Sequence, residues 1–197
     1  LIGDIREYAG HGAPVVEVSD KRSVAQGRPS SDNNLFFDLH TDMSFYDAPP
    51  EYVGFLMIRQ SDEGGSSLFC DGGAVAAALS DRAKAALRRP FAFAAPPHIP
   101  DGAEQAFPVM TQDRAGAVSL RYRRDGLRAL DAEQVDALRE FEQAIAAHKF
   151  ELKLLPGQLA VYSNKRLLHG RQAYRDTVSS QGRSALRAYF ASGDGVR

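Results

Sequence analysis

Two histidines and one carboxylate are the residues of this chain best suited to chemistry. His40 and Asp42 are separated by one residue, and His169 lies far downstream in segment 164–171. Two imidazoles and one carboxylate make up the 2-His-1-carboxylate iron site, which leaves positions on the metal open for reactants. Residues i and i+2 of an extended segment point to the same side, so Thr41 would face away from a shared ion. We therefore predict that His40, Asp42 and His169 bind one metal ion.

Two arginines and a serine have the chemistry to bind an anion near that metal. Arg183 lies 14 residues after His169, and Arg187 follows four residues later, so both point to one face if the segment is a strand. A guanidinium presents a fork of donors that can hold a carboxylate through two hydrogen bonds. Ser67 can add a hydroxyl from a glycine-rich turn, although a one-residue shift in register would put Ser66 there instead. The sequence thus predicts an anion site beside the metal.

Short strands separated by glycine and proline turns must position these side chains. Strands are expected at 35–39, 52–59, 118–123, 150–155, 158–162 and 185–190, with polar loops at 25–34, 96–104 and 171–182. A turn is expected at 63–67. The paired prolines of segment 47–50 predict a turn or a mobile lid.

Three helices are expected between the strands. The alanine-rich segment 74–79 is helical by propensity, and Ser80 caps a second helix that runs through Leu87 and stops before Pro90. The third helix begins after Asp131, with Gln134 placed as in a capping box. Its predicted apolar face consists of Val135, Leu138, Phe141 and Ile145.

Strands and helices do not alternate strictly, which disfavours a parallel sheet with crossover helices. A mainly β fold with flanking helices, of the β-sandwich or jelly-roll class, fits better because it brings segments that are distant in sequence to one opening of the fold. Ligands at positions 40, 42 and 169 require that convergence. We expect a single domain over residues 1–197, and the first residue, Leu1, indicates a truncated or incomplete chain.

Composition excludes several function classes. Of the 197 residues, 44% are hydrophobic and 25% charged, and 24 basic against 25 acidic residues leave a net charge of −1. That balance predicts neither a nucleic-acid nor a membrane surface, and no apolar stretch approaches the roughly 20 residues of a membrane span. The first residues do not resemble a signal peptide. The single cysteine, Cys70, excludes an internal disulfide and fits a reducing compartment, so we expect a cytoplasmic protein. Nothing in the sequence predicts the oligomeric state.

Several segments taken together resemble a known family. They are Leu-His-Thr-Asp at 39–42, Glu-Gly-Gly-Ser-Ser at 63–67, Leu-Pro-Gly-Gln-Leu at 155–159 and Asn-Lys-Arg-Leu-Leu-His-Gly-Arg at 164–171, followed by the two arginines at 183 and 187. The combination is similar to the taurine dioxygenase and clavaminate synthase group of iron(II)- and 2-oxoglutarate-dependent oxygenases, over about residues 35–190. The resemblance implies a double-stranded β-helix, which is a cupin-like variant of the jelly roll.

The resemblance also implies a role for each candidate residue. His40, Asp42 and His169 match the iron ligands, and Arg183 matches the residue that binds the distal carboxylate of 2-oxoglutarate. The 14-residue spacing from His169 to Arg183 is more similar to clavaminate synthase and nearby amino-acid hydroxylases than to taurine dioxygenase. Ser67 takes the place of the threonine in the family's Gly-Gly-x-Thr. The remaining arginine, at position 187, matches one that in relatives reaches the anionic group of the substrate or supports the co-substrate.

The implied reaction is oxidation of an unactivated C–H bond in a small substrate that is anionic or derived from an amino acid. Hydroxylation is the expected outcome, with dioxygen consumed and 2-oxoglutarate converted to succinate and CO2. Desaturation, epoxidation and cyclisation by the same oxidant are alternatives. Asp42 argues against halogenation, because halogenases that resemble this pattern carry a small residue there.

This chain departs from the family pattern in two ways. It is short, and the inserts that usually build the family's substrate pocket are the parts it lacks. The closest relatives of clavaminate synthase often carry Glu where this chain has Asp42, and either carboxylate can bind iron. Two other functions stay open: a cupin-type hydrolase or isomerase using zinc or manganese, and a non-catalytic jelly roll that binds a small molecule.

The other polar residues that stand out have simpler interpretations. His11, His98 and His148 are expected on the surface, and Cys70 is expected to be a small buried apolar residue. Asn164 is expected to orient the segment that leads to His169. Arg171, at the end of segment 164–171, can face the site or form a salt bridge.

Overall fold

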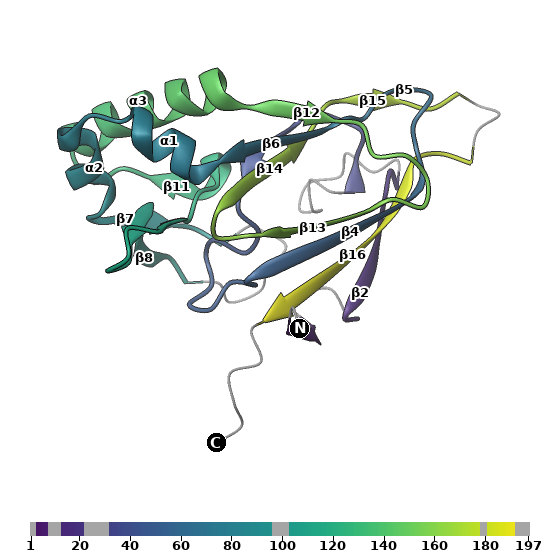
Figure 1. Ribbon diagram of the computed structural model, residues 1–197, viewed down its shortest axis with the longest axis horizontal. Coiled ribbons are helices and arrows are strands. Elements are labelled where there is room, and N and C mark those ends of the chain that lie inside the picture. The colour runs from purple at the N-terminus through teal and green to yellow at the C-terminus, as the bar shows by residue number, and fades with distance from the viewer. Residues whose placement is uncertain (1–2, 8–12, 22–31, 96–102, 178–180, 192–197) are drawn as a thin grey trace.

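Two antiparallel sheets lie face to face at the centre of the molecule (Figure 1), in a computed structural model that describes residues 3–7, 13–21, 32–95, 103–177 and 181–191. The larger sheet has the order β1-β16-β4-β13, with β2 also paired to β16. Its strands are β1 (Asp4–Arg6), β2 (Val15–Ser19), β4 (Tyr52–Arg59), β13 (Leu159–Ser163) and β16 (Ser184–Ala191). The second sheet has the order β12-β6-β14-β3. Its strands are β3 (Phe37–His40), β6 (Ser67–Asp71), β12 (Phe150–Leu152) and β14 (Leu167–Arg171).

The helices and two of the small sheets lie together at one end of the molecule, and helices there contact the second sheet (Figure 1). The helices are α1 (Gly72–Ala78), α2 (Asp81–Leu87) and α3 (Ala132–His148), with a short 3-10 helix η2 (Arg124–Gly126). The small sheets are formed by β7 (Pro90–Phe93), β8 (Gln105–Pro108) and β11 (Leu127–Arg128), by β9 (Met110–Gln112) and β10 (Val118–Leu120), and, at the opposite end, by β5 (Glu63–Gly64) and β15 (Tyr174–Arg175). The predicted mainly β fold with flanking helices is confirmed.

Side chains fix where the helices begin. The carboxylate of Asp131 accepts a hydrogen bond from the backbone N–H of Gln134 (2.8 Å), and the Ser80 hydroxyl accepts one from Ala83 (3.1 Å), so both predicted caps are confirmed. Such a cap typically contributes about 1 kcal/mol. The first helix starts two residues earlier than predicted, because Asp71 caps it by accepting from the backbone N–H of Ala74.

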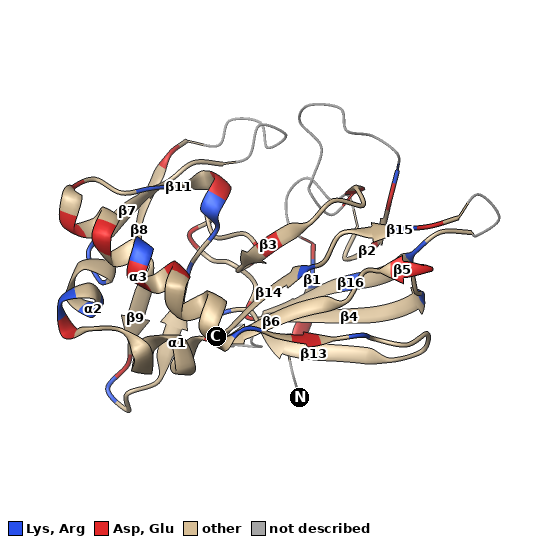
Figure 2. Ribbon diagram, turned by 90° about the horizontal axis from the view of Figure 1, so that it is seen from above, with Lys and Arg blue, Asp and Glu red and all other residues tan. Residues whose placement is uncertain are grey.

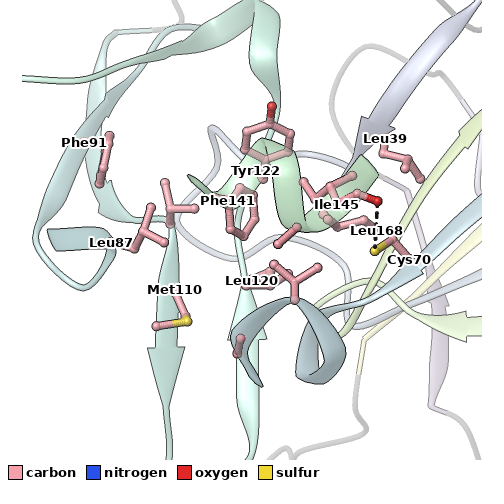
Figure 3. Packing of buried hydrophobic residues seen from close by; sticks show 14 of the residues in the cluster. Leu39, Cys70, Leu87, Phe91, Met110, Leu120, Tyr122, Phe141, Ile145 and Leu168 are labelled. Atoms are coloured by element: carbon pink, nitrogen blue, oxygen red, sulfur yellow. Dashed lines mark hydrogen bonds between the residues drawn. The ribbon is translucent and has the colours of Figure 1, made fainter. Parts of the chain in front are cut away.

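The main hydrophobic core lies between the helices and the second sheet (Figure 3). Leu68 and Cys70 of β6 belong to the same buried cluster as Phe141 and Ile145 of α3. The Cys70 thiol also contacts the Ile145 carbonyl at 3.8 Å, and the predicted burial of this cysteine is confirmed. Because side chains alternate along a strand, the neighbours of these residues on β6 face the other sheet instead.

The prediction of the buried apolar face of α3 was wrong at one position. Val135 is 46% exposed, whereas the side chain of Gln134 is 1% exposed. The buried amide donates to the Pro90 carbonyl (2.9 Å) and accepts from the Leu130 N–H (2.7 Å). A polar residue can therefore occupy the buried face because both of its hydrogen-bonding groups have backbone partners.

Strand boundaries agree with the sequence to different degrees. The prediction for 52–59 matches β4, but the strand expected at 35–39 starts at Phe37, and the strand expected at 118–123 ends at Leu120. The next residue, Arg121, leaves the strand path and donates side-chain hydrogen bonds to the carbonyls of Ser44, Tyr46 and Asp47.

Several predicted loops and two histidines involve residues that the structure does not describe. Residues 25–31, 96–102 and 178–180 of three expected loops, together with His11 and His98, lie outside the described residues. The loop expected at 171–182 begins with the last residue of β14 and contains β15. The short strands β7, β8 and β9 were not predicted, because runs of three or four residues carry little periodicity.

Charged residues are concentrated on the helices and loops, and the strands of the two large sheets carry few (Figure 2). His148 is exposed at the end of α3, as predicted. None of the described helices combines the length and the apolar composition needed to cross a bilayer.

Candidate active site

Strand register brings the two histidines together. β14 lies between β3 and β6, and its residue His169 pairs with His40 on β3 and with Phe69 on β6. The imidazole ring centroids of His40 and His169 are 4.5 Å apart. Two residues far apart in sequence are therefore cross-strand neighbours.

Asp42 reaches the same side by a different route from the one predicted. β3 ends at His40, so the extended segment does not continue through Asp42. Thr41 turns away as predicted: its N–H donates to the Tyr122 carbonyl (2.8 Å), and its hydroxyl accepts from the Tyr122 N–H (3.1 Å). Asp42 is then held by the side chain of Asn164, whose carbonyl oxygen accepts from the Asp42 N–H at 2.7 Å.

The three side chains place their ligand atoms at one point. One ligand atom from each of His40, Asp42 and His169 lies within 4.8 Å of the other two, and all three residues are buried. Asp42 Oδ1 is 3.4 Å from His40 Nε2, and Asp42 Oδ2 is 3.2 Å from His169 Nε2. Two ligand atoms each about 2.1 Å from one ion and at right angles to each other are about 3 Å apart. The spacing of these atoms fits a shared metal ion.

The protonation state of His40 also suits a metal ligand. Its Nδ1 donates to the backbone carbonyl of Asp38 at 2.8 Å, which leaves the lone pair on Nε2, facing Asp42. Burial and the neighbouring His169 lower the pKa of His40, against the opposing effect of Asp42. A neutral imidazole with its acceptor nitrogen turned into the site is the form that binds a metal.

Asp42 is held in its charged form. Burial disfavours the carboxylate, but the charge of Arg187 and the two histidines hold the pKa of Asp42 well below its usual range. Arg187 Nη1 lies 3.8 Å from Asp42 Oδ1. The site therefore combines an anionic oxygen ligand with a nearby cation.

A cavity between the two sheets joins all six residues predicted for the site. Its wall includes His40, Asp42, Ser67, His169, Arg183 and Arg187. Apolar side chains complete it, among them Val18, Phe55, Phe69 and Leu154, and Tyr162 packs against the ring of His169 (centroids 4.8 Å apart). The apolar part of the wall was not predicted, because no local pattern distinguishes these residues from core residues.

Arg183 is a buried cation with unused donors. Its side chain is 2% exposed, and neither Nε nor Nη1 has a hydrogen-bond partner among the described residues. Burial and the charge of Arg171 lower its pKa to about 10, so it is still protonated at neutral pH. Buried donors are normally paired, so these nitrogens indicate a place for an anionic ligand.

Three open predictions can be compared with the geometry. Ser67 lines the cavity, whereas Ser66 is absent from the residues that line it. Arg171 also lines the cavity, but its Nη2 donates to the carbonyls of Asn33 and Leu35 and it forms no salt bridge among the described residues. The segment 47–50, suggested as a lid, does not line the cavity, and Arg121 fixes its first carbonyl.

The sequence matches one protein family over residues 2–189, that of "Taurine catabolism dioxygenase TauD, TfdA family". Among curated proteins, none matches this chain. Solved structures do: asparagine oxygenase, in complex with Fe(II), 2S,3S-3-hydroxyasparagine and succinate, is 25% identical with a TM-score of 0.86. The match covers 95% of this chain and 60% of that one.

A second solved structure shares the fold at lower identity. The non-heme iron oxygenase OrfP, in complex with Fe and alpha-ketoglutaric acid, is 17% identical with a TM-score of 0.77. That match covers 93% of this chain and 58% of OrfP. The chain thus spans about three fifths of the length of these solved proteins.

Proposed function

This chain belongs to the taurine catabolism dioxygenase TauD, TfdA family, and from that membership we propose that it is an iron(II)- and 2-oxoglutarate-dependent oxygenase. Its proposed reaction is hydroxylation of an unactivated C–H bond in a small amino acid or amino-acid-derived substrate. The observation that carries the proposal is the cavity that holds both His40–Asp42–His169 and the guanidinium of Arg183, two nitrogens of which have no hydrogen-bond partner among the described residues.

The two ends of that cavity call for different ligands. Two imidazole nitrogens and a carboxylate favour a divalent metal and leave positions open on it. The buried Arg183 favours a carboxylate, because an anion would satisfy donors that have no partner among the described residues. A co-substrate with a metal-chelating group and a distal carboxylate, such as 2-oxoglutarate, matches both ends.

In the proposed mechanism the protein mainly binds and orients the reactants. His40, Asp42 and His169 would hold the iron, which together with 2-oxoglutarate and dioxygen would supply the oxidising chemistry, with succinate and CO2 as products. Arg183 and Ser67 hold the distal carboxylate of 2-oxoglutarate. The apolar part of the wall, including Phe69, excludes water from the reacting groups.

The substrate class is proposed from Arg187 and from the solved relatives. Arg187 lines the cavity beside Asp42, where it can attract an anionic group of the substrate toward the metal. Asparagine oxygenase is solved with hydroxyasparagine, and OrfP with (3S)-hydroxy-L-Arg. Both ligands are amino acids with a carboxylate, which supports an amino-acid substrate for this chain.

An anaerobic titration tests the proposal. Iron(II) and 2-oxoglutarate added together should produce a weak visible charge-transfer band. Arg183→Met should raise the Kd for 2-oxoglutarate by roughly 30-fold or more, equivalent to about 2 kcal/mol, because a buried charged partner is lost. The matched control is Arg175→Met. Arg175 is exposed and donates hydrogen bonds to Glu63, so this substitution should leave the Kd for 2-oxoglutarate unchanged.

Turnover then separates this function from the alternatives. We expect succinate to form from 2-oxoglutarate when the correct amino acid is supplied from a panel of L-amino acids. Metal binding without the band or succinate would favour a cupin-type hydrolase or isomerase. No metal binding at all would leave only a non-catalytic binding protein.

A further inference from the structure

Asp42 is the one candidate metal ligand of the three that no strand holds. His40 and His169 sit on paired strands, but β3 ends before Asp42 is reached. The residue after Asp42 adds strain, because the backbone of Met43 has φ = 55°, a left-handed conformation that residues other than glycine seldom adopt. Something outside the sheet must therefore fix the backbone that carries this carboxylate.

The side chain of Asn164 makes that connection. Its Oδ1 accepts from the Asp42 N–H (2.7 Å), and its Nδ2 donates both to the Asp42 carbonyl (2.9 Å) and to the Pro50 carbonyl (2.9 Å). The first two bonds pair the N–H and the C=O of one residue, as a neighbouring strand would. The amide can have only this orientation, since the reverse would set its oxygen against two carbonyls.

Asn164 is itself held firmly. It is 1% exposed, and its backbone N–H donates to the Glu51 carbonyl at 2.8 Å. It lies in the turn between β13 and β14, five residues before His169. Asn164 therefore connects the strand that carries one ligand to the loop that carries another.

We propose that Asn164 is a positioning residue, which sets the place of the Asp42 carboxylate relative to the two histidines and thereby determines the metal affinity of the site. It contacts the backbone of Asp42 rather than the carboxylate, so it acts through Asp42. This inference rests on the proposed metal site, and it assigns to Asn164 a role beyond orienting the segment that leads to His169.

The test is Mn(II) binding by calorimetry, with Mn(II) as an air-stable probe of the iron site. Asn164→Ala should raise the Kd for Mn(II) by about 10- to 100-fold, the usual effect of removing a residue that orients a metal ligand. Asn164→Asp should weaken binding similarly, because it has the same shape but cannot donate to the carbonyls of Asp42 and Pro50.

Gln134→Ala is the matched control. Gln134 is an equally buried amide with two hydrogen bonds to backbone groups, but it lies in the helical layer. The Gln134→Ala substitution should lower the melting temperature without changing the Kd for Mn(II). At saturating Mn(II), Asn164→Ala should bind 2-oxoglutarate close to the wild-type Kd, because Arg183 is untouched; a purely structural collapse of the cavity would weaken both.

Three results would overturn the inference. The first is wild-type Mn(II) affinity in Asn164→Ala, and the second is an equal loss in Gln134→Ala. If both Asn164 variants fail to fold, amide hydrogen exchange in the wild-type protein decides. The backbone amide of Asp42 should be protected from exchange to the same degree as the amides of β14. Exchange of the Asp42 amide at the rate of a solvent-exposed loop is the third contrary result. Wild-type protein that binds no Mn(II) refutes the metal site itself, which is a separate failure.

Discussion

Burial gives single residues of this molecule their chemical character. The imidazole of His40 is neutral, because burial and His169 lower its pKa, and that state leaves a lone pair for a metal. Arg183, by contrast, stays charged at neutral pH even though burial lowers its pKa to about 10. The same desolvation therefore yields a neutral imidazole in one place and a buried cation in another, because the two groups start from very different intrinsic pKa values.

The thiol of Cys70 should be unreactive in the folded protein. Burial, with the charge of Asp71, raises its pKa from 9.0 to about 11. A raised pKa means less thiolate at any given pH, and two pKa units correspond to roughly 100-fold less of the reactive form at pH 8. Alkylation by iodoacetamide at pH 8 should be at least that much slower in native protein than in 6 M guanidinium. Equal rates in the two conditions would show that Cys70 is accessible.

At the scale of elements, the contact between β14 and β3 decides the geometry of the site. Gly170 sits between His169 and Arg171, where β3 passes very close. A Cβ at Gly170 would lie 2.5 Å from the Phe37 carbonyl oxygen and 3.0 Å from that of Asp38. The Asp38 carbonyl is the one that accepts from His40 Nδ1, so the strand spacing and the orientation of that histidine depend on the same atoms.

Gly170→Ala should therefore disturb the metal site as well as the fold. The methyl group must push β3 away from β14, at a cost of about 1–3 kcal/mol in the free energy of unfolding. It should also weaken Mn(II) binding, measured by calorimetry, because His40 moves with β3. Gly157→Ala is the control: Gly157 has φ = 84° with open space around it, so its replacement should cost about 1–2 kcal/mol from backbone strain alone. Unchanged Mn(II) affinity in Gly170→Ala would contradict this account of the strand contact.

At the scale of the whole molecule, the larger sheet carries apolar side chains on both faces. Its inner side carries the cavity, while alternation along the strands turns Leu56, Ile58, Leu159, Val161 and Leu186 outward. Leu159 is 61% and Val161 39% exposed, and no described helix lies over this face (Figure 1). Antiparallel sheets with one face in water usually carry polar residues there, so an apolar outer face is typical of a sheet covered on both sides.

The exposed face should bind a hydrophobic dye when this chain is studied by itself. The double substitution Leu159→Lys with Val161→Lys should lower the fluorescence of added anilinonaphthalene sulfonate. Each change should alter the free energy of unfolding by no more than about 0.5 kcal/mol, since exposed side chains contribute little packing. Val135→Lys is the control, because Val135 is an exposed apolar residue on α3, away from the sheet. An equal fall in fluorescence for the control would show that the sheet is not the dye site.

Local patterns carried much of the sequence-based prediction. The helix starts at Ser80 and Asp131 depend on hydrogen bonds within three residues, so they could be predicted. The strand at 52–59 could be predicted because it depends on its own composition. The fold class followed from the order of such segments. The exposed position of Val135 could not be predicted, because it depends on which helix face meets the second sheet rather than on the helix itself.

The sequence by itself determined which residues could form a metal and anion site, through residue type and spacing at His40, Asp42, His169 and Arg183. Only the tertiary structure decided how they meet. The register of β14 between β3 and β6 sets His169 opposite His40 and puts Ser67 rather than Ser66 in the cavity wall. The physical reason is range: spacing along the chain fixes what a short segment can offer, but register and burial come from packing between segments more than a hundred residues apart, as with Asn164 and Asp42.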